Sequence, residues 1–581
     1  MSANSTTMNS KAQLIEKWSK AEVISGSDML LRSLLLEGAE CVFGYPGGAV
    51  LFIYDAMHGF TDFQHLLTRH EQGAIHAADG YARSTGKVGV CIATSGPGAT
   101  NLVTGIATAY MDSVPLVVIT GNVVSSLIGS DAFQEADIVG ITMPITKHSY
   151  LVKSAEELPR VIHEAFHIAN SGRKGPVLID IPKDVSAQKA LFQPVNQVSL
   201  RGYNPTVQPN KMQVDKMLKA IAEAERPVIL AGGGVVYSGA HEELFEFVTK
   251  TGIPTTTTLL GLGGFPSGHE LHMGMPGMHG SYTANTSIQN ADLLINIGAR
   301  FDDRVTMKLE GFAPKAKIVH IDIDPAEIGK NVPTDIPIVA DVKTTLQLAN
   351  ATVKYAAKAD AWRKQIAESK ANKPFKYIDS DVELKPQWVV SMIHETTNGD
   401  AIVTTDVGQH QMWAAQYYPL NKPRSWVTSG GLGTMGFGFP SAIGAQMGNP
   451  DRVVVSINGD GGMQMCAQEL AICAINNIPV KVAIINNQVL GMVRQWQEII
   501  YDNRYSHIDL AGSPDFVKLA EAYGVKAFRA SNKEEARSAW EAALQHPGPA
   551  VVEFVVRKEE NVYPMVTQGS TIDQMLMGDS E

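Results

Sequence analysis

The sequence of 581 residues has only four cysteines, no run of 18 apolar residues and no excess of basic charge. Cys41, Cys91, Cys466 and Cys473 lie in apolar segments without CxxC or Cys/His spacing, which argues against a zinc site and indicates reduced packing residues of a cytoplasmic protein. The missing apolar run excludes a membrane-spanning helix. The formal net charge of −11 argues against a nucleic-acid partner, because binding phosphates needs clustered Lys and Arg.

The chain is too long for one hydrophobic core, and its 44% hydrophobic residues are typical of a globular protein. Short apolar runs alternate with helical stretches, which indicates parallel sheets covered on both faces. We predict an α/β fold of three doubly wound parallel-sheet domains. The predicted strands of the first and third domains are similarly spaced along the sequence. The predicted parts are a flexible N-terminal extension (1–20), a first domain (21–190), a linker (191–210), a central domain (211–350), a bridging helical segment (351–385), a third domain (386–560) and a C-terminal tail (561–581) that we interpret as a lid.

The most informative stretch is one βαβ unit in the third domain. An apolar β-branched run ends in Asn458-Gly459-Asp460-Gly461-Gly462, a helix-length segment follows, and a second apolar run ends in Asn486-Asn487. Because parallel strands of such a unit end at the same edge of a sheet, Asp460 and Asn487 are expected to lie close together.

One carboxylate and one amide oxygen are hard ligands that suit Mg²⁺, whose remaining positions are usually filled by phosphates and water. Glycines beside Asp460 let a diphosphate approach the backbone. A bare Gly-Asp-Gly is usually only a tight turn, but the paired Asn-Asn at crossover spacing favours a metal site. Val489 can supply only a backbone oxygen as a third ligand.

These residues resemble a known signature, in which GDG and NN bind thiamin diphosphate. With QHQMWAAQ (409–416), GGLGTMGFGFP (430–440) and GMVRQWQ (491–497), the chain resembles the catalytic subunits of acetohydroxyacid synthase, also called acetolactate synthase, from about residue 21 to its end. The resemblance implies a pyrimidine-binding first domain, an FAD-binding central domain and a diphosphate-binding third domain.

The resemblance implies that pyruvate is decarboxylated on thiamin diphosphate and that its two-carbon unit is transferred to pyruvate or 2-ketobutyrate, as in branched-chain amino acid biosynthesis. The enzymatic alternative is a flavin-dependent pyruvate oxidase, which acetolactate formation without oxygen uptake would exclude. The alternative from another class is a regulatory paralogue that binds the cofactor without activity, which the presence of Glu71, Asp460 and Asn487 disfavours.

Glu71, within 68–83, matches the glutamate that hydrogen-bonds N1′ of the cofactor's aminopyrimidine, a role that burial of the carboxyl group favours. Its alternative is an acidic residue at a helix N-terminus. Met435 matches an apolar wedge beneath the cofactor, and its alternative is core filler. The thiamin diphosphate contacts implied are Glu71, Gln409, His410, Gly433, Met435, Gly459, Asp460, Gly461, Gly462, Asn487, Gly491 and Met492.

The resemblance implies that Arg304 and Trp496 select the acceptor 2-ketoacid. Arg304 can hold the acceptor's carboxylate through two hydrogen bonds, and Trp496 would pack on the acceptor's alkyl group. The alternative for Arg304 is an ordinary loop residue that forms salt bridges with Asp302 and Asp303. The alternative for Trp496 is a buried core tryptophan. Gln134 completes the implied catalytic set.

Six glycine-rich or acidic stretches of the central domain match FAD-contacting segments of the synthase. Because the synthase reaction has no net redox step, the flavin is expected to be structural or vestigial. The implied FAD contacts are Arg173, Gly232, Gly233, Leu260, Gly274, Met275, His279, Gly280, Arg300, Asp302, Arg304, Asp322, Ile323, Glu327, Asp341 and Val342. The resemblance further implies a homodimer or homotetramer with a small regulatory subunit.

Overall fold

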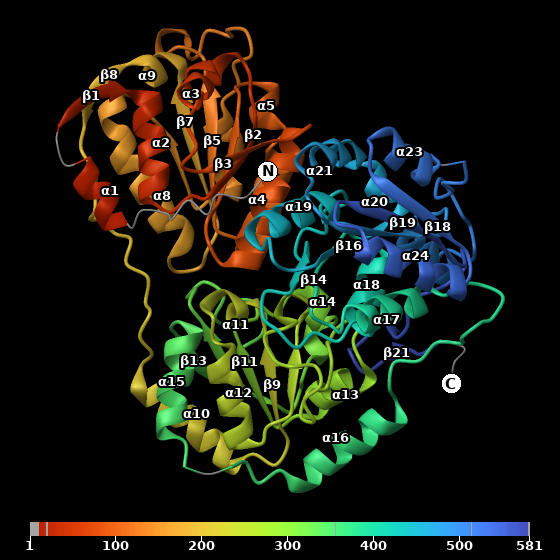
Figure 1. The fold of residues 1–581 in the computed structure, drawn as a ribbon. Coiled ribbons are helices and arrows are strands. Elements are labelled where there is room, and N and C mark those ends of the chain that lie inside the picture. The colour runs from red at the N-terminus through yellow and green to blue at the C-terminus, as the bar shows by residue number, and fades with distance from the viewer. Residues whose placement is uncertain (1–10, 19–20, 355, 513, 579–581) are drawn as a thin grey trace. The chain divides into compact units, whose positions relative to one another are not determined.

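The computed structural model describes residues 11–18, 21–354, 356–512 and 514–578. By its contacts the chain forms two compact units. The first unit comprises Met1–Asn204, Gly431–Arg452 and Cys466–Val480, and the second comprises Pro205–Gly430, Val453–Met465 and Lys481–Glu581. Each unit is built around parallel sheets that carry helices on both faces (Figure 1).

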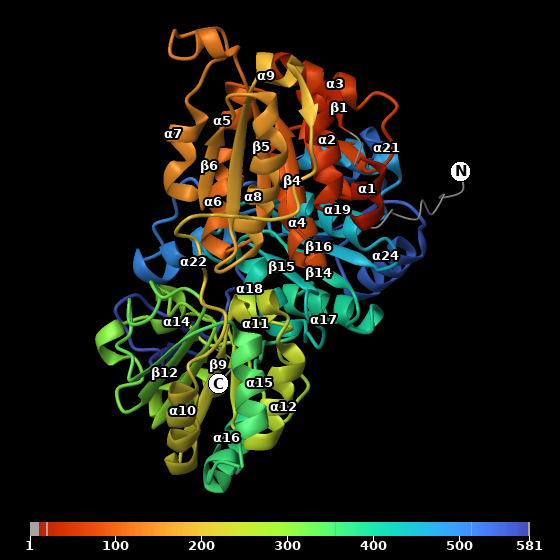
Figure 2. The same cartoon turned by 90° about the vertical axis from the view of Figure 1, so that its left-hand side faces the viewer.

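The first unit contains a parallel sheet of six strands in the order β3-β2-β4-β5-β7-β6. Its strands are β2 (Cys41–Tyr45), β3 (Gln64–Leu67), β4 (Gly89–Ala93), β5 (Leu116–Asn122), β6 (His148–Leu151) and β7 (Pro176–Pro182). Helices α2 (Gly26–Leu36) and α8 (Leu158–Asn170) cover one face, and α4 (Glu71–Thr85) and α6 (Val103–Asp112) lie on the other (Figures 1 and 2). The first unit also contains α3 (Leu51–Ala56), α5 (Pro97–Thr100), α7 (Ile138–Thr142), α9 (Lys183–Ala187), α19 (Gly438–Gly448), α21 (Leu470–Asn476) and the antiparallel pair β1 (Glu22–Ser25) and β8 (Lys189–Phe192).

The second unit contains the central sheet, with parallel strands in the order β10-β9-β11-β12-β13. These are β9 (Pro227–Ala231), β10 (Thr255–Thr257), β11 (Leu293–Ile297), β12 (Lys317–Asp322) and β13 (Ile336–Val339). Its helices are α10 (Lys211–Glu223), α11 (Gly233–Ser238), α12 (His241–Thr251), α13 (Tyr282–Asn290), α14 (Asp303–Thr306), α15 (Val342–Thr352) and α16 (Asp360–Asn372).

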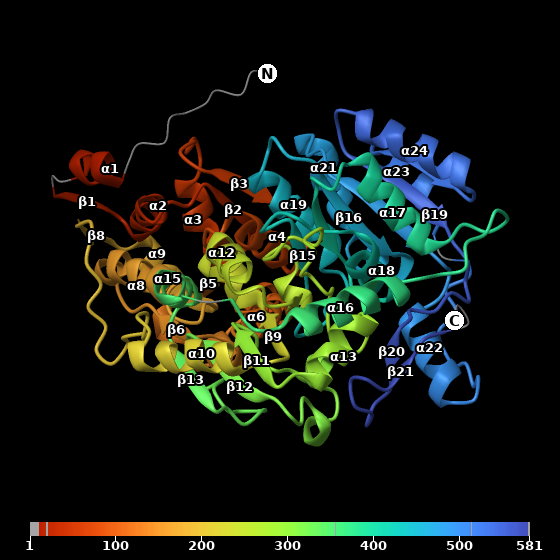
Figure 3. The same ribbon diagram turned by 90° about the horizontal axis from the view of Figure 1, so that it is seen from below.

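The second unit also contains a six-stranded parallel sheet in the order β15-β14-β16-β17-β19-β18, which repeats the strand order of the first unit's sheet. Its strands are β14 (Ile402–Thr405), β15 (Trp426–Thr428), β16 (Val454–Gly459), β17 (Lys481–Asn486), β18 (Lys526–Ala530) and β19 (Ala550–Val555). Helices α17 (Pro386–Thr396), α18 (Gln409–Tyr417) and α24 (Lys533–Gln545) bury one of its faces (Figure 3). The remaining helices are α20 (Asp460–Gln464), α22 (Gly491–Ile500) and α23 (Phe516–Ala522). Three covered parallel sheets confirm the predicted fold class, while the exact domain boundaries stay predictions.

Two predicted peripheral segments differ from the sequence interpretation. Of the N-terminal extension, residues 1–10 and 19–20 lie outside the described residues, but Lys11–Lys17 form helix α1, with Leu14 buried. The bridging segment 351–385 contains the helix α16 but is irregular from 373 to 385. Helix α16 is not fully exposed, because Trp362 and Ile366 pack into the central core.

The C-terminal tail, interpreted from the sequence as a lid, contains a short pair of strands and several buried residues. Residues Met565–Val566 (β20) and Met575–Leu576 (β21) form an antiparallel pair. Val562 and Ile572 are fully buried, as is β20. Their irregular spacing gives no period in the sequence, yet each side chain packs within the second unit. No described helix is long and apolar enough to cross a membrane.

Candidate active site

The two strand ends predicted to bind metal lie next to each other. β16 and β17 are parallel neighbours, with Gly459 opposite Ile485. Asp460 follows β16 directly, and Asn487 follows β17. The backbone N–H of Gln488 donates to Asn486 Oδ1 at 3.0 Å and also lies close enough to the Asp460 carboxyl group to favour its charged form. The structure therefore brings Asp460 and Asn487 together at one edge of the sheet.

The two consecutive asparagines have different environments. Asn486 Nδ2 donates to Glu553 Oε1 at 2.7 Å, so this side chain is fixed within the sheet. Asn487 Nδ2 instead donates to Gln409 Oε1 at 3.4 Å, and its Oδ1 accepts from the Val489 N–H at 3.2 Å. Successive side chains of a strand point to opposite sides, which explains why only one of the two faces this edge.

The environment of Asp460 is suited to a bound cation. Burial raises the pKa of its carboxyl group to about 7, against an ordinary value of 3.8. Among the described residues, its buried Oδ2 has no hydrogen-bond partner. An unpartnered buried oxygen is costly, and a divalent cation would both satisfy it and stabilise the charged form. The part of the chain that the structure describes contains no group of three or more His, Cys, Asp or Glu arranged for a metal, so the donors that fit are one carboxylate, one amide oxygen and backbone.

Glycines keep the space around this edge open. A side chain at Gly462 would overlap the Asp406 carboxylate, and one at Gly491 would overlap Gln409 Oε1. A Cβ at Gly491 would also lie 2.7 Å from Asn487 Nδ2. Glycine is therefore required at both positions by the polar side chains that converge there.

Helix α18 contributes Gln409 and His410 from the end of the adjacent strand β14. Both side chains are buried. The His410 ring donates to the Asp406 backbone carbonyl, but burial dominates and lowers the pKa of His410 to about 3, so the ring is neutral. His410 Nε2 has no partner among the described residues. The absent Cβ of Gly459 makes room for this ring, since it would lie 2.9 Å from Nδ1.

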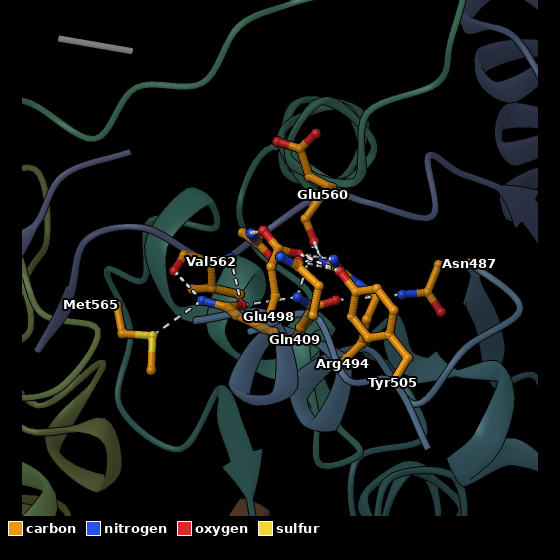
Figure 4. Close-up of polar contacts among 11 residues, drawn as sticks. Gln409, Asn487, Arg494, Glu498, Tyr505, Glu560, Val562 and Met565 are labelled. Atoms are coloured by element: carbon orange, nitrogen blue, oxygen red, sulfur yellow. Dashed lines mark hydrogen bonds and ion pairs between the residues drawn. The ribbon is translucent and has the colours of Figure 1, made fainter. Parts of the chain in front are cut away.

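Helix α22 presents a network of polar side chains at the same edge (Figure 4). Arg494 and Gln495 are buried, and both bond to the segment after β19. Trp496 and Met492 are half-buried. Trp496 is therefore not the fully buried core residue that was its alternative, although its role in acceptor choice stays a prediction.

Glu71 lies in the first unit as the first residue of α4. It is half-buried, and its Oε2 accepts a hydrogen bond from Asn101 Nδ2 at 3.0 Å. A Cβ at Gly98 would lie 3.2 Å from the other carboxylate oxygen. The preceding His70 caps the helix by accepting from Gln72 N–H at 3.0 Å. Because His70 supplies the cap, the Glu71 carboxylate remains available for other contacts.

Glu469 supports the same helix end, and the sequence analysis missed it. Its carboxylate accepts from the Arg69 N–H at 3.1 and 3.2 Å and also from the His70 N–H. It is 1% exposed, and burial raises its pKa to about 7. A side chain at Gly73 would overlap it. The only sequence signal was an acidic residue within the apolar stretch 465–475.

The glycine-rich segment that carries Met435 is anchored within the first unit. The Gly431 N–H donates to Asp112 Oδ1 at 2.7 Å, and Thr108 and Thr434 join their hydroxyl groups at 2.7 Å. Met435 itself is half-buried and therefore not ordinary core filler. Its neighbour Gly433 is exposed.

Two further predicted residues, Gln134 and Arg173, also lie in the first unit. Gln134 has a positive φ of 59°, and its backbone approaches Gly96, whose Cβ would lie 2.7 Å from the Gln134 oxygen. Arg173 Nε donates to Ser113 Oγ at 3.0 Å. The relation of Arg173 to the predicted flavin site stays a prediction.

Most predicted FAD residues of the central sheet lie at or beyond its strand ends. Gly232 follows β9 and Asp322 ends β12. His279 Nε2 is buried without a partner in the described chain, and burial lowers the pKa of His279 to about 4. Asp302 and Asp341 cap helices α14 and α15, so their carboxylates already have structural partners. The remaining predicted contacts of this set, within 233–342, stay predictions.

Arg304 matches both of its interpretations in part. Its guanidinium pairs with Asp303 at 3.4 Å, which is the predicted alternative of a salt-bridged loop. The side chain is 63% exposed, and Nη1 also approaches Met278 Sδ at 3.6 Å. Its carboxylate-binding role stays a prediction.

Two residues of the third domain's edge were also missed. Asp406 lies within the stretch AIVTTDVG (401–408), and its position three residues before predicted Gln409 was an available signal. Gln495 lies within the motif GMVRQWQ but is polar and 0% exposed, which no sequence pattern indicates.

Three family models match the chain in order. They are described as thiamine pyrophosphate enzyme N-terminal TPP binding domain (residues 24–141), central domain (214–348) and C-terminal TPP binding domain (406–554). Glu71 lies in the region matched by the first model, and Asp460 and Asn487 lie in the region matched by the last.

Relatives that match nearly the whole chain identify the family more narrowly. The acetolactate synthase large subunit of Haemophilus influenzae is 47% identical over 562 residues, which cover 95% of this chain and 98% of that protein. The acetolactate synthase isozyme 3 large subunit of Escherichia coli is 48% identical over 571 residues, 96% of this chain and 100% of that protein. Acetolactate synthase 1, chloroplastic, of Nicotiana tabacum is 47% identical over 576 residues, 97% of this chain and 86% of that protein. The predicted function is thereby confirmed, and the chain belongs to the acetolactate synthase family of thiamine pyrophosphate-dependent enzymes.

Proposed function

We propose that Asp460, Asn487 and the Val489 carbonyl hold Mg²⁺, which anchors the diphosphate of thiamin diphosphate. The observation that carries the proposal is the buried, unpartnered Asp460 Oδ2 beside the Asn487 side chain. Hard oxygen donors with an open side suit a cation that keeps phosphate and water ligands. Gln409 and neutral His410 line the same edge and complete the polar surroundings of the diphosphate.

When bound, thiamin diphosphate supplies an electron sink that lets pyruvate lose CO₂ and its two-carbon unit join a second 2-ketoacid. Glu71 would hold N1′ of the bound aminopyrimidine through a carboxylate oxygen that can accept and return a proton. Its position is set by Asn101 and by the α4 N-terminus, so the oxygen is presented in one orientation. Met435, half-buried on an anchored segment, supplies an apolar support for the cofactor.

We assign acceptor binding to Arg304 and Trp496, with pyruvate and 2-ketobutyrate as acceptors. The exposed guanidinium can exchange Asp303 for a substrate carboxylate, and a half-buried indole offers an apolar surface. One methylene in such a contact changes the rate by roughly 10 to 200-fold. In competition assays, Trp496→Leu should lower the preference for 2-ketobutyrate, and an unchanged product ratio would remove Trp496 from this role.

The central domain is proposed to bind FAD as a structural group, with the unpartnered His279 Nε2 as the supporting observation. Flavin absorbance of the purified protein tests this directly. Since relatives are named large subunits, we also propose a small regulatory subunit, together with a homodimer or homotetramer of this chain in the cytoplasm.

The decisive assay supplies pyruvate, Mg²⁺ and thiamin diphosphate and follows acetolactate and oxygen together. The proposed reaction forms acetolactate without oxygen uptake. Stoichiometric oxygen uptake with little acetolactate would instead identify a flavin-dependent pyruvate oxidase.

A further inference from the structure

The C-terminal segment 560–565 is joined to the predicted metal-binding edge by three buried amide side chains. The series runs from the Val562 backbone through Gln495 and Gln409 to Asn487. Gln495 is 0% exposed, Gln409 is 3% exposed and Asn487 is 7% exposed. Buried amides in contact constrain each other, because each donor end must meet an acceptor.

The orientation of the first amide is fixed by the main chain. Gln495 Oε1 accepts from the Val562 N–H at 2.9 Å, and Gln495 Nε2 donates to the Val562 carbonyl at 2.9 Å. A backbone N–H can only donate and a carbonyl can only accept, so a flipped Gln495 would lose both bonds. Gln495 Nε2 also lies 3.3 Å from Met565 Sδ.

This orientation passes to the next two amides. Because Gln495 presents an acceptor, Gln409 must present its Nε2, which donates to Gln495 Oε1 at 2.9 Å and to the Glu560 carbonyl at 3.0 Å. Gln409 Oε1 then faces Asn487 Nδ2 at 3.4 Å. The nitrogen of Asn487 is thus turned toward Gln409, and its oxygen points away from the network (Figure 4).

We propose that Gln495 is a positioning residue that, through Gln409, directs the oxygen rather than the nitrogen of Asn487 toward the metal. An amide nitrogen cannot bind Mg²⁺ as the oxygen does, so a flipped Asn487 would lose one ligand. The C-terminal segment 560–565 determines which end of each amide faces the next. Bonds other than those to the three amides hold this segment in place. Arg494 Nη2 donates to the Glu560 carbonyl at 3.0 Å, and Lys385 Nζ and Gln387 Nε2 bind the Glu560 carboxylate at 2.6 and 2.9 Å.

The same helix offers a matched control. Gln497 also bonds both backbone groups of one residue, accepting from the Ser506 N–H at 3.0 Å and donating to its carbonyl at 3.1 Å. Both of these bonds are exposed, and no described bond joins Gln497 to Gln409 or Asn487. Changing Gln497 therefore removes an equivalent pair of side-chain to backbone hydrogen bonds from α22 and leaves the bonds among Gln495, Gln409 and Asn487 intact.

The test is Gln495→Met against Gln497→Met, with Mg²⁺-dependent thiamin diphosphate binding measured by calorimetry. Methionine keeps the length of glutamine and introduces no charge. Gln495→Met should raise the Mg²⁺ concentration at half-saturation about tenfold, the lower range for residues that support metal ligands. Gln497→Met should change it less than about twofold, and kcat of Gln495→Met at saturating Mg²⁺ should stay within about threefold of wild type. Equal shifts in both variants, or no shift in Gln495→Met, would contradict the inference.

A measurement on the wild-type chain covers the case in which Gln495→Met does not fold. Adding Mg²⁺ with thiamin diphosphate should slow amide exchange in 560–565, which the series joins to the site, and leave 504–508 unchanged. No slowing in 560–565 would contradict the inference. The inference rests on the proposed cofactor site, and the two fail separately. Wild-type protein that binds no thiamin diphosphate with Mg²⁺ overturns the site, whereas normal wild-type binding with an unaffected Gln495→Met overturns the positioning role alone.

Discussion

Asp460 in the second unit and Glu469 in the first are both buried acids whose pKa is raised to about 7 by burial. Their partners differ. Both Glu469 oxygens accept from the Arg69 N–H, and the His70 N–H adds a further bond, whereas Asp460 Oδ2 has no partner in the described chain. The acid with both oxygens bonded orders a helix end, and the acid that keeps one oxygen without a partner is suited to a cation. Burial alone therefore does not distinguish a structural acid from a ligand-binding one.

The largest expected effect separates the chemistry of the α4 end from binding at the strand edge. Glu71→Gln should lower kcat by about 10²- to 10⁴-fold, because the amide cannot accept and return the proton. Mg²⁺-dependent binding of thiamin diphosphate, followed by calorimetry, should be retained. Near-normal turnover in this variant would remove Glu71 from the reaction.

A change at the strand edge should instead affect binding of the cofactor. Asp460→Asn should weaken Mg²⁺-dependent thiamin diphosphate binding by more than about 100-fold, the upper range for residues that only support metal ligands. Glu469→Gln, an equally buried change, serves as the control and should leave that affinity nearly unaltered. Comparable losses in the two variants would erase the distinction between the two acids.

A smaller effect concerns the stability of the metal-free protein. Burial raises the pKa of both acids from ordinary values of 3.8 and 4.5 to about 7, so the folded chain keeps protons that the unfolded chain releases. The contribution of these two acids to the free energy of unfolding should therefore fall as pH rises from about 4 to about 7. Asp460→Asn and Glu469→Gln should each flatten part of this slope in thermal unfolding with a chelator.

Adding Mg²⁺ with thiamin diphosphate sharpens this comparison. A cation stabilises the Asp460 carboxylate, so the Asp460 share of the slope should disappear while the Glu469 share remains. A slope that is unchanged by Mg²⁺, or stability that rises with pH in this window, would contradict the assignment.

The sequence was sufficient for features that depend on local pattern. Apolar runs ending at Gly459 and Asn486 predicted two adjacent parallel strands, which the structure contains as β16 and β17. Their shared edge also placed Asp460 beside Asn487. Strand periodicity and crossover geometry fix such positions without reference to the rest of the chain.

Features that depend on distant partners were not predictable. The single helix expected after Asp460 is two short helices, α20 and α21, because residues from Cys466 onward pack in the first unit rather than the second. Glu469 and Gln495 gain their significance from Arg69 and Val562, which lie far away in sequence. The burial of Val562, Met565 and Ile572 in the tail was not predictable either, because these residues follow no period in the sequence.

The central claim is that oxygen atoms at two neighbouring strand ends hold the cation that anchors the cofactor. Its most direct test is calorimetric titration of thiamin diphosphate into metal-free wild-type protein, first with a chelator and then with Mg²⁺. Binding that requires Mg²⁺, and that Asp460→Asn loses, is the predicted result. Thiamin diphosphate binding of equal strength in the presence of the chelator would contradict the account.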